Sequence, residues 1–81
     1  MKLWIISQDE YSGYDTFDSA VVAAESEDDA KNMYPGTGKP LDSLDGYRDW
    51  TSHPDAVSCE FIGEAKEGTL KSVICASFNA G

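Results

Sequence analysis

The stretch "YDTFDSAVVAAESEDDAKNMYPG", residues 14–36, decides the fold because its pattern changes from that of a strand to that of a helix. Its first half is rich in β-branched and small apolar residues, which favour a strand with its core at residues 19–24. Tyr14 and Phe17 do not alternate onto one face. The beginning of this strand is therefore expected to bulge or to belong to the preceding loop.

The second half of the stretch carries the start and stop signals of a helix. Ser26 is a good N-cap. The residues after it are acidic and would lie in the first turn, where negative charge interacts favourably with the helix dipole: Glu27, Asp28 and Asp29. Apolar residues then recur at i, i+3 and i+4 and form one stripe: Ala30, Met33 and Tyr34. Pro35 and Gly36 are expected to stop the helix after about nine residues, a length that is marginal unless the helix lies on a sheet.

The sequence on either side of this stretch supplies further strands. Residues 2–8, "KLWIISQ", are apolar on both faces, which indicates a central strand, or one covered on both sides, antiparallel to the strand at residues 14–24. Residues 56–65 and 72–79 are expected to form a hairpin joined by "KEGTLK". The predicted fold is an α+β domain over residues 1–81, with a small antiparallel sheet of about four strands and one short helix on one face, in the order β-β-α-loop-β-β.

The charge of the chain restricts its partners. There are 15 acidic and 6 basic residues, a net charge of −9, and this argues against direct binding to nucleic acid or to an anionic membrane. It favours attraction to a protein with a basic surface. The apolar run at residues 3–6 is too short for a signal peptide or a membrane span, so a cytoplasmic protein is expected.

The cysteines and the single histidine do not form a recognisable catalytic or metal-binding pattern. Cys59 and Cys75 are 16 residues apart, whereas zinc ligands are usually paired at short spacing. Both lie in apolar strands and are expected to be reduced core thiols, although a hairpin turning near residue 67 could bring them together in an incidental disulfide. His53 is expected in an exposed loop. The prediction is a protein that is not an enzyme, with no catalytic residue, no metal and no cofactor.

Three stretches carry a resemblance to a known family: "MKLWIISQ", "YDTFDSAVVAAESEDDAKNMYP" and "EFIGEAKEGTLKSVICASFNAG". Together they resemble an uncharacterised family of short acidic proteins encoded in phages and bacterial genomes. The resemblance implies a small, complete, intracellular protein of mobile-element origin, and it carries over no functional residue. In size, charge and layout the chain is also similar to some anti-CRISPR proteins, which cover the basic nucleic-acid-binding surface of a host defence complex.

The leading hypothesis is a non-enzymatic, protein-binding inhibitor of such a host complex. The proposed contacts are acidic residues, with aromatic residues as anchors: Tyr14, Asp15, Asp18, Glu27, Asp28, Asp29, Tyr47 and Trp50. The alternative for Tyr47 and Trp50 is that they pack under the long loop at residues 35–56 and complete the core. The alternative function is a small-ligand-binding or regulatory domain that dimerises through an exposed strand edge. A monomer and a homodimer are both left open.

Overall fold

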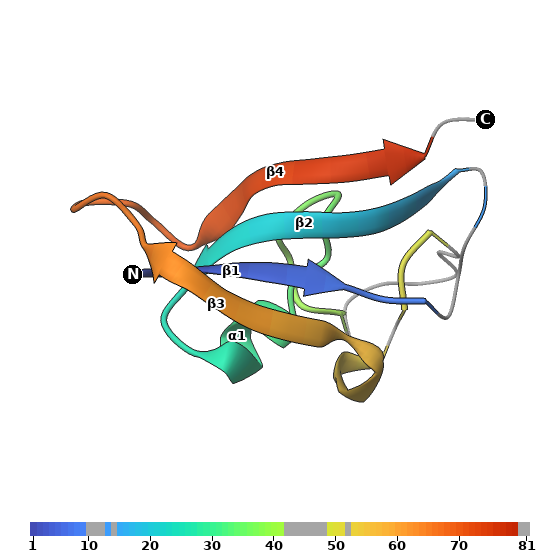
Figure 1. Cartoon of the computed structure of the whole chain (residues 1–81), viewed down its shortest axis with the longest axis horizontal. Coiled ribbons are helices and arrows are strands. Elements are labelled where there is room, and N and C mark those ends of the chain that lie inside the picture. The colour runs from blue at the N-terminus through green and yellow to red at the C-terminus, as the bar shows by residue number, and fades with distance from the viewer. Residues whose placement is uncertain (10–12, 14, 42–48, 52, 80–81) are drawn as a thin grey trace.

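A computed structural model describes residues 1–9, 13, 15–41, 49–51 and 53–79. Within these residues, four strands form one antiparallel sheet in the order β3-β1-β2-β4 (Figure 1). The strands are β1 (Lys2–Ser7), β2 (Thr16–Ala24), β3 (Ser58–Glu64) and β4 (Ser72–Asn79). Between β2 and β3 the chain forms one α-helix, α1 (Glu27–Lys31), and the 3-10 turn η2 (Pro54–Ala56). The predicted α+β class, with a small antiparallel sheet and a short helix, is confirmed.

Strand β1 is central, as its apolar residues on both faces predicted. It pairs with β2 on one side and with β3 on the other. Trp4 and Ile6 are buried in the core, and the indole Nε1 of Trp4 donates a hydrogen bond to the carbonyl oxygen of Ala24 at 3.0 Å. Ile5 alternates onto the opposite face, where it lies next to Val21. This opposite face is called the outer face below.

Strand β2 bulges at its beginning. This was predicted because Tyr14 and Phe17 do not alternate onto one face of a strand. Phe17 pairs with Phe78 of β4 and Ser19 pairs with Ser77, so Asp18 has no opposite residue. Just before the strand, Asp15 has a φ of 61°, in the left-handed region that aspartate tolerates better than most residues.

Helix α1 begins as predicted and ends earlier than predicted. The side chain of Ser26 accepts a hydrogen bond from the backbone N–H of Asp29 at 3.2 Å, which is the expected N-cap. The helix has five residues, so the prediction of about nine was wrong. The chain leaves the helix because the backbone N–H of Leu41 donates to the carbonyl oxygen of Asn32, and Met33 forms a β-bridge with Pro40. Tertiary pairing thus replaces the last helical turns.

The predicted hairpin of β3 and β4 is wrong. These strands lie at opposite edges of the sheet, and residues 65–71 pass the ends of β1 and β2 to connect them (Figure 1). The strands are three spacings apart, about 14 Å, and seven extended residues can span about 20 Å. Cys59 and Cys75 pair with the central strands from opposite sides and are both free. The incidental disulfide is therefore excluded, because its Cα atoms would have to lie within about 7 Å.

The core lies between one face of the sheet and the segments that cover it, which include α1. The sheet contributes alternating residues of its two central strands: Trp4, Ile6, Ala20, Val22 and Ala24. The covering segments contribute apolar residues from the helix and the irregular regions: Ala30, Met33, Tyr34, Leu41, Trp50 and Val57. The apolar stripe predicted for the helical stretch is thus buried, even though its last members lie beyond the end of α1.

Candidate functional site

The predicted aromatic anchors do not form an exposed cluster within the structure as described. Tyr14 and Tyr47 lie outside the described residues. Trp50 has none of its surface exposed and belongs to the core, so the alternative of a core tryptophan replaces that of an exposed anchor. Its indole Nε1 is buried without a hydrogen-bond partner among the described residues. Trp50 therefore offers no surface to a partner.

The predicted acidic residues fall into two groups at opposite ends of β2. Asp15 and Asp18 are exposed at the beginning of the strand. Glu27, Asp28 and Asp29 follow its end, in the first turn of α1. Six residues of extended chain between Asp18 and Ala24 correspond to about 20 Å. The structure thus does not bring the predicted carboxylates together on a single face.

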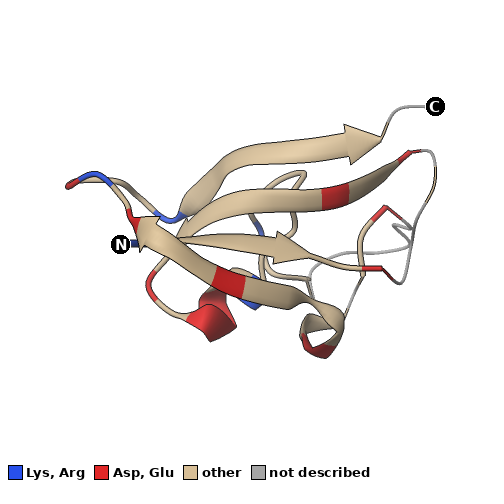
Figure 2. Cartoon of the chain, in the orientation of Figure 1, with Lys and Arg blue, Asp and Glu red and all other residues tan. Residues whose placement is uncertain are grey.

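The elements that contact α1 carry further exposed carboxylates, which the sequence analysis did not include in the candidate site. α1 packs against β3 and against η2, and each of these three elements carries acidic residues (Figure 2): the exposed Asp55 lies on η2 and the exposed Glu60 on β3. Glu60 pairs with Ile5 and therefore lies on the outer face, whereas α1 covers the opposite face of the sheet. We call Glu27, Asp28, Asp55 and Glu60 the acidic edge. In the sequence Asp55 and Glu60 are isolated acids, and only the pairing of β3 with β1 reveals their position.

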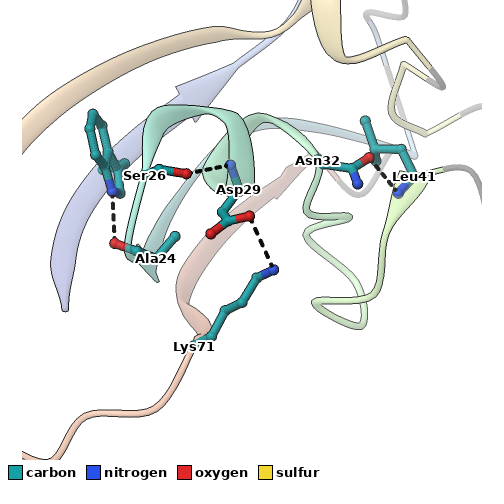
Figure 3. A network of polar contacts seen from close by, with 7 residues as sticks. Ala24, Ser26, Asp29, Asn32, Leu41 and Lys71 are labelled. Carbon is teal, nitrogen blue, oxygen red and sulfur yellow. Dashed lines mark hydrogen bonds and ion pairs between the residues drawn. The ribbon is translucent and has the colours of Figure 1, made fainter.

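Asp29 has a different role from its two neighbours in the helix. Its carboxylate oxygen Oδ1 lies 4.0 Å from the ammonium Nζ of Lys71, which precedes β4 (Figure 3). Its backbone N–H donates to the Ser26 side chain. At the other end of the helix, the side-chain Oδ1 of Asn32 accepts from the backbone N–H of Leu41 at 3.2 Å. These contacts fix both ends of α1. Glu27 and Asp28 therefore lie on a helix whose position relative to β4 and to Leu41 is held by side-chain contacts.

Cys59 of β3 is partly buried and packs against the core, on the face of the sheet that α1 covers. Burial raises the pKa of its thiol, the carboxylate of Glu27 raises it further, and the ammonium of Lys31 acts in the opposite direction. Both charged groups belong to α1, which packs against β3. A raised pKa leaves less thiolate at neutral pH, and thiolate is the nucleophilic form. Cys59 is therefore suited to packing and poorly suited to nucleophilic catalysis.

Other kinds of site find no support in the part of the chain that the structure describes. No group of three or more His, Cys, Asp or Glu side chains there could hold a metal ion. No helix among the same residues is long and apolar enough to cross a membrane. Comparison with known proteins finds no match to a protein-family model, to a curated protein or to a solved structure.

Proposed function

We propose that this chain is a small acidic protein-binding module of phage type, without enzymatic activity, that inhibits a nucleic-acid-binding defence complex in the cytoplasm of a bacterial host. It would do so by covering a basic surface with its acidic edge. The observation that carries the proposal is that three elements packed against one another, α1, η2 and β3, each carry exposed carboxylates in a chain of net charge −9.

The carboxylates of the acidic edge are available to a partner. Within the described part of the chain, no base lies within 4.0 Å of Glu27, Asp28, Asp55 or Glu60, whereas Asp29 pairs with Lys71. An arginine that binds a phosphate also binds a carboxylate, through the same planar fork of N–H donors. A partner's phosphate-binding groove would therefore accept the acidic edge in place of nucleic acid.

The same charges predict how binding proceeds. A partner with a basic groove would be attracted over a distance of about one Debye length, roughly 8 Å at physiological ionic strength. Association would be fast at low salt and would slow steeply as salt is added. Each exposed ion pair is expected to contribute about 0.2–1 kcal/mol, so affinity would depend on several carboxylates together.

The test is affinity capture from the lysate of a bacterial host, followed by measurement of nucleic-acid displacement from the captured protein. We expect a nucleic-acid-binding protein that releases its DNA or RNA when the chain binds. Glu27→Lys combined with Asp28→Lys should weaken binding about tenfold or more, which is about 1.4 kcal/mol. The same loss is expected for a variant with Asp55→Lys and Glu60→Lys.

A control variant distinguishes the position of the substituted carboxylates from the change in the net charge of the chain. Asp9→Lys combined with Asp18→Lys changes the net charge by the same amount as Glu27→Lys with Asp28→Lys, for which it is the control. Both residues are exposed and lie near the end of the sheet where Ser7 pairs with Ser19, whereas α1 follows the opposite end of β2. Asp15 is avoided because its positive φ would strain a lysine. The proposal would be refuted if the control pair weakened binding as much as Glu27→Lys with Asp28→Lys. It would also be refuted if the captured protein kept its nucleic acid.

A further inference from the structure

The two edges of the sheet differ in charge. β3 carries Glu60 and Glu64, and α1 packs against it. β4 carries no charged residue along its eight positions, "SVICASFN" (Figure 2). Charged side chains and covering elements are the usual protection of an edge strand against pairing with another chain. β3 has this protection and β4 lacks it.

The β4 edge is also apolar and exposed. Ile74 is 53% exposed and Phe78 is 46% exposed, and Cys75 is exposed between them. Leu70, just before the strand, is 80% exposed. Among the described strands β4 pairs with β2 alone, so one row of its backbone N–H and C=O groups faces outward. Such an edge offers both backbone hydrogen bonds and apolar contacts to a further strand.

We propose that the strand that pairs with β4 is the β4 of a second copy of this chain. A two-fold axis perpendicular to the sheet makes the two β4 strands antiparallel and leaves each residue facing the same side in both copies. Cys75 then lies opposite its own counterpart near the centre of the strand, and the two sheets continue into one. The contact is isologous, as in most homodimers.

Charge distribution favours a second copy at this edge over any other part of the surface. Two chains of net charge −9 repel each other, and contact through the acidic edge would bring carboxylates together. In the proposed dimer the two β3 strands are seven strand spacings apart, about 34 Å, which is several Debye lengths at physiological salt. The uncharged edges meet, and the acidic edges lie at the two ends.

The antiparallel register also places opposite charges near each other. With Cys75 opposite its counterpart and Ile74 left unpaired in its bulge, Lys71 of one copy lies opposite Phe78 of the other, next to Asn79. Asp15 lies next to Asn79, because its backbone N–H donates to the carbonyl oxygen of Asn79. Each end of the paired strands thus brings the exposed Lys71 of one copy toward the exposed Asp15 of the other, which favours this register.

The first test is the molar mass in solution, measured by sedimentation equilibrium over a range of concentrations. Wild-type protein is expected to dimerise, and Ile74→Lys is expected to make it monomeric. Ile62→Lys is the matched control, since Ile62 is 49% exposed and is the unpaired residue of a bulge in β3, as Ile74 is in β4. Both substitutions reduce the net negative charge equally, so dissociation could not result from greater repulsion. A wild-type monomer, or a dimer that Ile62→Lys dissociates, would overturn the proposal.

The second test needs no substitution in β4. In a Cys59→Ala background, Cys75 should be joined rapidly to its counterpart by a short bismaleimide, because directly opposite residues have Cα atoms about 5 Å apart. A dimer that resisted this cross-link would overturn the register. Val21→Lys, on the outer face beside Cys75, tests the other arrangement, in which two sheets pack face to face. Dissociation by Val21→Lys but not by Ile74→Lys would show that arrangement and refute pairing through the edge.

Discussion

Removing the hydrogen bond between Tyr34 and Asp49 tests how much this contact stabilises the segments that cover the sheet. Tyr34 is 5% exposed, and its hydroxyl donates to the carboxylate oxygen Oδ2 of Asp49 at 2.7 Å. The ring also packs edge-on against Phe17 of β2, with 5.9 Å between ring centres. Tyr34→Phe keeps the ring and removes the hydroxyl, so it isolates the polar contribution.

The magnitude follows from the charge and burial of the acceptor. A hydrogen bond to a charged group contributes about 1.5–3 kcal/mol. The other oxygen of Asp49, Oδ1, is buried and has no partner in the part of the chain that the structure describes. Tyr34→Phe should therefore lower the free energy of unfolding by about 2 kcal/mol. For a chain of 81 residues this corresponds to a decrease in Tm of about 8–16 °C.

The assay is urea denaturation followed by tryptophan fluorescence and circular dichroism. In the double variant with Asp49→Asn, the effect of Tyr34→Phe should fall by about 1 kcal/mol or more, since the charged acceptor is gone. A loss below about 0.5 kcal/mol for Tyr34→Phe, or full additivity with Asp49→Asn, would refute the reasoning, because surface substitutions have effects of that size.

Three further outcomes are expected. Ser26→Ala should lower the free energy of unfolding by about 1 kcal/mol in urea denaturation, because it removes the N-cap of α1. Trp50→Phe should cost less than Trp4→Phe in the same measurement, since the Trp50 indole N–H is buried without a partner whereas that of Trp4 donates to a carbonyl; the reverse order would contradict the assignment. In a Cys75→Ala variant, Cys59 should be alkylated more slowly than free cysteine at neutral pH, and its rate should keep rising above the ordinary thiol pKa, because a raised pKa lowers the thiolate fraction at each pH below it.

Local features of the fold could be predicted from the sequence. The N-cap at Ser26, the central position of residues 2–7 and the bulge near Phe17 each depend on a few neighbouring residues and on alternation or capping rules. The early end of α1 could not be predicted, because it depends on hydrogen bonds that the backbone N–H of Leu41 donates to the oxygens of Asn32 across a loop. Local propensity does not include such partners.

The position of the last two strands shows the same limit on a larger scale. Two strands separated by a short polar segment usually pair with each other. Here β3 pairs with β1 and β4 pairs with β2, and nothing within residues 56–79 distinguishes this arrangement from a hairpin. The same limit applies to the candidate site: Glu27 and Asp28 were found from the helix start, whereas Asp55 and Glu60 are assigned to it only because η2 and β3 pack against α1.

The separation of charge between the two edges connects the two proposals. An uncharged β4 edge and an acidic edge on the far side of the same sheet allow a chain of net charge −9 to meet its copy and a basic partner without conflict. A dimer through β4 would present two acidic edges about 34 Å apart. A partner with a repeated basic groove at that spacing would be bound twice, with a gain in affinity that comes from effective concentration and not from any new contact. Ile74→Lys should then weaken binding to such a partner while leaving every carboxylate of the acidic edge in place. An unchanged affinity in a variant shown to be monomeric would mean that each edge acts alone.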